Sequence, residues 1–344
     1  PAVSGYAAQD DAAPPNDQHL AMGRKIEGDW WVAFRSPPLN GVITQALSGN
    51  QTAETARQRM AQAEEDVNAA EGALLPQVSL GTTAGRQKYG KSLFGPLNIG
   101  IPPFTYYTIG PSVTFPLDLF GGGRRTVEER KAFLDYQHFE LDAAYQSLSA
   151  HVVAQALALA GARAQLDTMN AIIADDQRNV DLVQASITSG SGTKVQLVSA
   201  QSQLAEDKTL LPDLRQQMAA ARHALAILVG KAPAEWSPPA FTLEDFTLPR
   251  EIPVSMPSQL VHRRPDILAA EAQLHVASAA IGVATANLYP KIDLTGTVTQ
   301  QALTPGRLFN SVNNAWSIAA GLTQPLFDGG RLSAQRRAVL HNYQ

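Results

Sequence analysis

A long run of apolar residues spaced seven apart constrains this chain more than any other feature of its sequence. The run lies within residues 124–188, and its first seam comprises Tyr145, Val152, Leu159, Leu166, Ile173, Val180 and Ile187. No proline interrupts the run, so it predicts a single helix on the order of 100 Å long. A helix of this length cannot be enclosed by a compact globule and must lie along other helices, as in a coiled coil.

A second heptad run follows a short turn rich in glycine and serine. Its apolar members predict a returning helix over about 193–229, which Pro212 should kink: Leu197, Leu204, Leu211, Met218 and Leu225. The two runs together predict a long antiparallel helical hairpin over 124–229. A shorter helix over about 51–75 and the returning helix have together nearly the length of the long helix, so both could pair with it end to end.

The chain also repeats itself with an offset of 214 residues. Ala53, Met60, Val67 and Leu74 fall on Ile267, Leu274, Ile281 and Leu288, and a proline and an alternating strand follow each segment. The repeat predicts four regions: an N-terminal extended segment over 1–40, a first repeat over 41–230, a connector over 231–264 and a second repeat over 265–344. The second repeat is expected to lack roughly 93 residues, which would contain its own long helical hairpin.

Each repeat contains a predicted β-hairpin, over 77–117 in the first and 291–326 in the second. Apolar and polar residues alternate along each strand, and the strands have the length of tilted strands that span a bilayer. Four strands are too few to close a useful barrel, so this interpretation requires several copies of the chain. No run of about 18 apolar residues is expected to cross a membrane as a helix. We therefore predict a mainly α, internally duplicated protein with a small membrane β part.

Composition and motif spacing exclude several classes of function. The 27 basic and 31 acidic residues give a net charge of −4, which does not favour nucleic acid as a partner, and the chain has no cysteine. Its seven histidines are scattered without metal-ligand spacing. Asp118 and Asp328 occupy related strand-to-helix turns, where they are predicted to cap helices. We predict no catalytic, cofactor-binding or metal-binding residue, and therefore no enzyme.

Several motifs occur in a fixed order along nearly the whole chain. They include Gly28-Asp29-Trp30-Trp31, Leu117-Asp118-Leu119-Phe120-Gly121-Gly122, Arg263-Arg264-Pro265-Asp266-Ile267 and Pro325-Leu326-Phe327-Asp328-Gly329-Gly330. In this order they resemble the TolC-like outer membrane factors, and more closely the NodT-type outer-membrane efflux lipoproteins.

The resemblance implies a trimeric α/β-barrel channel in the bacterial outer membrane with a helical tunnel in the periplasm. Such a channel is a passive exit duct for drugs or other small molecules, served by a periplasmic adaptor and an inner-membrane pump. It also implies a lipid anchor on a cysteine just before Pro1, and acidic gating residues beyond Gln344. The family meets its adaptor at the hairpin tip, so the resemblance assigns that contact to Thr188, Ser189, Gly190, Ser191, Gly192 and Thr193.

Two alternatives to an efflux channel remain open from the sequence alone. A periplasmic coiled-coil adaptor or scaffold also has long helical hairpins, although it does not need hairpins of membrane length. A type I secretion duct would share the architecture and carry polypeptides. Four aromatic residues are candidates for a belt at the membrane–water interface, with core packing as the other interpretation: Tyr106, Tyr107, Phe115 and Trp316.

Overall fold

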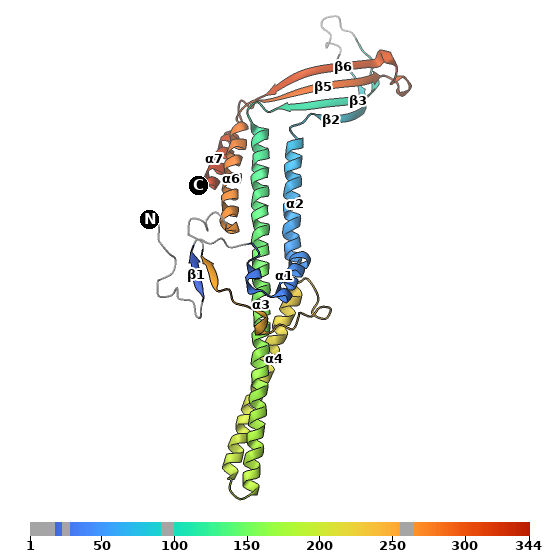
Figure 1. Cartoon of the computed structure of the whole chain (residues 1–344). Helices are drawn as coiled ribbons and strands as arrows, with labels where there is room; N and C mark the ends of the chain where they lie inside the picture. Colours follow the sequence, from blue (N-terminus) through green and yellow to red (C-terminus); the bar gives the residue numbers. More distant parts are fainter. Residues whose placement is uncertain (1–17, 23–27, 91–99, 255–263) are drawn as a thin grey trace. The chain divides into compact units, whose positions relative to one another are not determined.

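The computed structural model describes residues 18–22, 28–90, 100–254 and 264–344 (Figure 1). They form two compact units, and each unit combines segments from both halves of the sequence. The first comprises Pro1–Arg59 and His138–Leu268, and the second Met60–Gln137 and Ala269–Gln344. This division cuts across the two predicted repeats, because the helices that contain Arg59, Gln137 and Leu268 each continue from one unit into the other. The repeats as domains therefore stay a prediction.

The predicted helical hairpin is present, and its residues from His138 onward belong to the first unit. Helix α3 (Gly122–Thr188) runs without interruption for 67 residues, and α4 (Lys194–Leu228) returns beside it (Figure 1). Helix α4 continues through Pro212. Three seam positions that the heptads predicted are almost completely buried in the core between them: Val152, Leu159 and Leu225. Leu148 and Ala221 belong to the same buried core.

Two further helices begin close to this core. Helix α1 (Pro37–Gly49) is capped by the Ser36 side chain, which accepts a hydrogen bond from the backbone N–H of Leu39. Asn50 ends α1 and opens α2 (Gln51–Gly72), since its Oδ1 accepts from the N–H groups of Thr52 and Ala53 at 2.9 and 3.1 Å. Within the predicted extended segment over 1–40, residues 30–34 form the short 3-10 helix η1 (Trp30–Phe34) and residues 37–40 begin α1.

A pair of short strands in the first unit had no signal in the sequence. β1 (His19–Met22) pairs in parallel with β4 (Glu251–Val254), and the 3-10 helix η2 (Leu243–Asp245) lies before β4 in the connector. The two strands are four residues long and far apart in the chain, so neither has a periodic pattern. Residues 255–263, which contain the start of the Arg-Arg-Pro-Asp-Ile motif, lie outside the described residues.

The second unit contains a four-stranded antiparallel sheet in the order β2-β3-β5-β6. Its strands are β2 (Gln77–Gln87), β3 (Phe104–Leu117), β5 (Lys291–Ala302) and β6 (Asn314–Thr323), which confirms both predicted hairpins. Two 3-10 helices, η3 (Pro305–Arg307) and η4 (Ser311–Asn313), form the β5–β6 connection. The first turns of α3, the end of α2, α6 (Pro265–Ala286) and α7 (Arg331–Tyr343) lead away from the sheet.

Helix α6 bears on the expectation that no helix of this chain crosses a membrane. Among the described helices it is the one whose length and composition would allow it to cross a membrane. Its apolar character comes largely from alanine. Within the second unit it lies beside α3 and α7, because His275 Nε2 is 3.1 Å from Glu128 Oε1 and Arg336 Nε donates to Thr285 Oγ1 at 3.1 Å. These polar contacts are typical of a helix that packs among helices.

Candidate functional site

One face of the sheet is apolar and open. Strand pairing places the apolar residues of all four strands on this face: Val78 and Leu80 of β2, Val113, Phe115 and Leu117 of β3, Ile292, Leu294 and Val298 of β5, and Trp316, Ile318 and Leu322 of β6. Several are strongly exposed, and Ile318 is 80 % exposed. A continuous apolar surface of this kind marks a contact with a membrane or with another protein.

The opposite face of the sheet is lined by small and hydroxyl-bearing residues. Ser79 Oγ lies 2.7 Å from Ser112 Oγ across the β2–β3 pair, and Thr297 Oγ1 lies 2.8 Å from Ser317 Oγ across the β5–β6 pair. Such side chains keep hydrogen-bonding capacity for water while occupying little volume. A sheet with one apolar and one hydrated face matches the strands of a barrel that encloses a polar interior within a membrane.

The two hairpins have the same register, which supports the predicted duplication. Gln77 of β2 pairs with Thr114 of β3, and Lys291 of β5 pairs with Thr323 of β6. Moving the first pair forward by 214 residues on β2 and by 209 on β3 gives the second pair. The outer edges of β2 and β6 are unpaired among the described strands, and exposed edges of this length favour pairing with another chain.

Both predicted aspartate caps are confirmed. Asp118 accepts hydrogen bonds from the backbone N–H groups of Gly123 and Arg124 at 2.9 and 2.8 Å, and so caps α3. Asp328 accepts from Gly330 and Leu332, both at 2.8 Å, and caps α7. Burial acts to raise the pKa of Asp118, but the hydrogen bonds from Arg124 and Gly123 outweigh it and hold the pKa below its usual value.

We expect Asp118→Ala to lower the free energy of unfolding by about 0.5–2 kcal/mol, the usual cost of losing a cap. The folded-state pKa of Asp118 is depressed, so this contribution is present at neutral pH and is lost as the pH falls through that folded-state pKa. Hydrogen exchange at the start of α3, measured between neutral and acidic pH, checks this. The control is Asp135→Ala on the exposed surface of α3. Equal exchange in the two variants at neutral pH would contradict the capping role.

The tip of the helical hairpin is closed by two capping motifs. At the end of α3, the N–H of Gly190 donates to the carbonyl of Ile187 and that of Ser191 to Ser186, with Gly190 at φ +80°. At the start of α4, Thr193 and Gln196 form a reciprocal capping box. Three apolar side chains near the tip are largely exposed: Leu182, Val195 and Val198. The tip is thus an ordered, accessible surface, and its contact with an adaptor stays a prediction.

The four candidate interface aromatics fall on different faces. Tyr107, Phe115 and Trp316 share the apolar face, and Trp316 is 72 % exposed there. Tyr106 lies on the hydroxyl-bearing face, where its ring covers Gly85 so closely that a Cβ on Gly85 would come within 2.6 Å of Tyr106 Cζ. Tyr106 therefore does not share a face with the other three, and their interfacial role stays a prediction.

Within the part of the chain that the structure describes, no group of three or more acidic residues, histidines or cysteines could hold a metal ion. The residues that define the site are those of the sheet faces and edges and of the hairpin tip. The alternation of apolar and polar residues along each strand predicts an apolar face for that strand. That the four apolar faces form one continuous surface depends on the pairing register between the strands.

Comparison with known proteins identifies this combination of long helical hairpin and two-faced sheet. A family model described as outer membrane efflux protein matches residues 42–231 and 256–344. The chain belongs to the outer membrane efflux protein family. This confirms the resemblance to TolC-like factors, the predicted fold class and the bacterial outer membrane as its location.

Relatives of the family with curated names match most of this chain. Fusaric acid resistance protein FusA of Burkholderia cepacia is 30 % identical, over 90 % of this chain and 59 % of FusA. Pyoverdine export outer membrane protein OpmQ of Pseudomonas aeruginosa is 31 % identical, over 94 % of this chain and 69 % of OpmQ. Nodulation protein T of Rhizobium leguminosarum is 28 % identical, over 94 % of this chain and 67 % of that protein. The chain thus spans roughly three fifths to two thirds of these proteins.

Among solved structures, the outer-membrane channel OprN superposes with a TM-score of 0.85 at 26 % identity, covering 100 % of this chain and 75 % of OprN. The outer membrane protein VceC from Vibrio cholerae gives a TM-score of 0.80 at 25 % identity, covering 93 % of this chain and 76 % of VceC. OprN is described as an outer-membrane channel and VceC as an outer membrane protein, and the absence of a catalytic site stays a prediction.

Proposed function

We propose that the complete protein is the outer-membrane channel of a tripartite efflux system, a passive exit duct for small molecules from the periplasm to the exterior. The observation that carries this proposal is the pair of opposite sheet faces. The apolar face suits lipid, and the hydroxyl-bearing face suits a watery passage. In a periplasmic scaffold, an open apolar face on strands of membrane length would be exposed to water, which is unfavourable.

Three copies of the chain would complete the barrel through the free edges of β2 and β6. Within one chain, β3 of the first repeat pairs with β5 of the second, with Thr114 opposite Thr295 and Thr108 opposite Gln301. The repeat offsets transfer this pairing to a junction between two copies. Adding 209 to a residue number of β3 gives its equivalent in β6, and subtracting 214 from a residue number of β5 gives its equivalent in β2. They place Thr323 opposite Gly81 of the partner subunit, and Ser317 opposite Gln87 of the partner subunit. The hydroxyl-bearing face of β6 then continues into the hydroxyl-bearing face of β2 at the new junction.

The names of the relatives support a small-molecule cargo. FusA is named for fusaric acid resistance and OpmQ for pyoverdine export, and neither name refers to a polypeptide. We extend this class of cargo to the present chain in preference to polypeptide secretion. The pump and the periplasmic adaptor would supply the energy and the selection, and the adaptor would dock at the tip residues 188–193. The capped turn and the exposed Leu182, Val195 and Val198 suit such a contact.

Conductance through full-length protein in planar bilayers tests the channel. Residues 1–344 contain no cysteine, so Thr297→Cys and Val298→Cys each add one thiol there, on opposite faces of β5. The unmodified full-length protein, treated with the same reagent, is the control for any cysteine outside these residues. A bulky methanethiosulfonate reagent should lower the conductance of Thr297→Cys and leave that of Val298→Cys unchanged. Adjacent residues of one strand are the matched controls for each other. Absence of conductance, or an equal effect at both positions, would contradict the proposed duct and favour the scaffold.

A further inference from the structure

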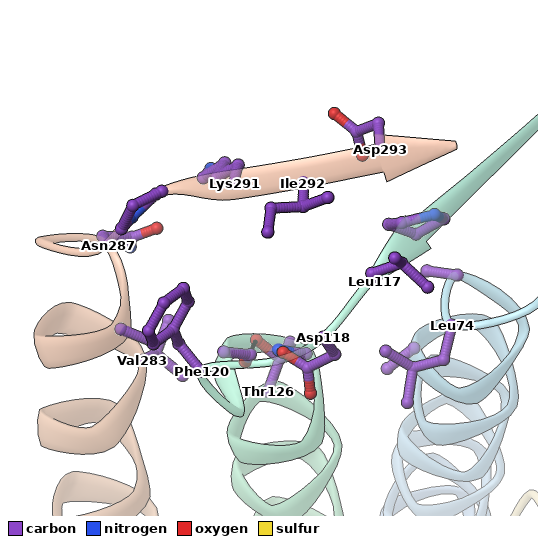
Figure 2. Close-up of a pocket in the computed structure, with 17 residues that line it drawn as sticks. Leu74, Leu117, Asp118, Phe120, Thr126, Val283, Asn287, Lys291, Ile292 and Asp293 are labelled. Carbon is purple, nitrogen blue, oxygen red and sulfur yellow. Dashed lines mark hydrogen bonds between the residues drawn. The ribbon is translucent and has the colours of Figure 1, made fainter. Parts of the chain in front are cut away.

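A cavity of about 330 Å³ lies in the second unit, where β3 and β5 meet the helices (Figure 2). Its volume falls at the lower end of the range for small-ligand pockets. The side chains that dominate its wall are apolar and come from both repeats: Leu74, Leu117, Phe120, Val283, Ala286 and Ile292. No part of the proposed channel activity uses this cavity.

The cavity is continuous with the apolar face of the sheet. Leu117 and Ile292 pair directly across the β3–β5 junction and are the last members of that face before the helices begin. In Figure 2 the Ile292 side chain points towards the helices, whereas Asp293 projects from the other side of the strand. The Phe120 ring closes one wall by stacking on Tyr289, with ring centroids 4.9 Å apart.

Two of the polar side chains in the lining, Asp118 and Thr126, are engaged by the protein itself. The carboxylate of Asp118 accepts from Gly123 and Arg124, and Thr126 Oγ1 donates to the carbonyl of Gly122 at 2.9 Å. A polar ligand would lose its bonds to water and gain few in return. A hydrocarbon chain has no hydrogen bonds to lose, and it would cover the apolar wall of the cavity.

The turns around the cavity carry a further set of exposed apolar side chains. Leu75 is 62 % exposed, Leu326 95 % and Phe327 92 %, and all three lie where a strand meets a helix. Exposed apolar side chains of this kind favour contact with the hydrocarbon of a membrane, so these turns are placed at its edge. The cavity therefore opens at the level of the leaflet that faces the helices.

We propose that this cavity binds a hydrocarbon chain of a phospholipid from the periplasmic leaflet of the outer membrane. The inference rests on the proposed function, since it takes the apolar face of the sheet as the surface that meets lipid. The bound chain would cover Leu74 and Val283, which belong to the helical side of the cavity, and so would join the ends of β3 and β5 to α2 and α6.

Photolabelling of full-length protein in lipid nanodiscs tests the site. The probe is phosphatidylethanolamine with a diazirine in one acyl chain, and labelled residues are mapped by mass spectrometry. We expect label on Leu74 and Val283 in addition to Leu80 and Ile318 of the sheet. Ala70 lines the cavity, so Ala70→Leu should fill it and reduce the label on Leu74 and Val283 severalfold without changing the label on the sheet.

Ala69→Leu adds the same volume to the neighbouring, exposed position of α2 and is the matched control. If Ala70→Leu does not assemble, Ala73→Leu tests the same wall. Label on the sheet but not on Leu74 and Val283, or label there that Ala70→Leu leaves unchanged, would overturn the lipid site and leave the channel intact. Absence of label on the sheet as well would overturn both. Label at Leu74 and Val283 from a diazirine-bearing lipid A probe in the outer leaflet would overturn the assignment to the periplasmic leaflet.

Discussion

Oxidation of the double variant Thr323→Cys with Gly81→Cys is expected to convert the full-length protein into covalent dimers and trimers on a denaturing gel. The repeat offsets place these residues opposite each other across the junction between copies. Directly opposed residues of antiparallel strands have Cβ atoms about 4.5–5.5 Å apart, close to the roughly 3.5–4.5 Å that a disulfide spans. Residues 1–344 contain no cysteine, so the unmodified full-length protein, oxidised in the same way, gives the background on the gel.

The register makes the crosslinking experiment specific. Thr323→Cys combined with Gln87→Cys moves the second thiol six residues along the same face of β2, out of reach of the first, and should remain monomeric on the gel. Each single-cysteine variant should also remain monomeric. Efficient crosslinking of the displaced pair, with none of the predicted pair, would show that β6 meets the partner subunit in another register.

Gly110→Ala is expected to abolish assembly of the sheet. A Cβ at residue 110 would lie 2.0 Å from the carbonyl oxygen of Val298 and 2.6 Å from the Cα of Thr299. Both are backbone atoms of β5, so no side-chain rotation can relieve the contact and the strands must separate. Separation would divide the sheet into two hairpins, and isolated two-stranded hairpins are marginally stable.

The fraction of protein recovered as folded trimer on a semi-native gel measures this effect. Gly296→Ala is the control, because a Cβ at that glycine of β5 has no atom within 4 Å. We expect little or no trimer for Gly110→Ala and near-normal recovery for Gly296→Ala. Similar recovery of the two variants would mean that β3 and β5 are not held as closely as the structure shows.

The elements that the sequence predicted correctly are those with a local repeat. The heptad positions from Tyr145 to Ile187 face one side of a helix because seven residues make nearly two turns, so α3 was predictable from spacing alone. The four strands alternate with a period of two, and the aspartates at 118 and 328 stand before glycine turns. Each of these signals lies within a few residues of the element that it specifies.

Features that depend on distant residues could not be read in this way. β1 and β4 have four residues each and are defined only by their pairing. Tyr106 and Tyr107 look alike in sequence, yet adjacent positions in a strand point to opposite faces, and the strand pairing decides which face is which. Gly110 lies within a strand and not in a turn, so the sequence gives no reason for a glycine there. The structure supplies the reason, since the backbone of β5 passes too close to residue 110 to leave room for a Cβ.

The long helical hairpin, the two membrane-length β-hairpins and their duplication could be predicted from the sequence, since they follow from the periods of helix and strand and from the self-similarity of the chain. The joining of the two hairpins through β3 and β5, and the merging of their apolar faces into one surface, depend on the three-dimensional structure. The cavity between Leu117, Ile292 and the helix ends depends on it as well. Register and packing bring together residues nearly two hundred positions apart, and no local periodicity specifies such contacts.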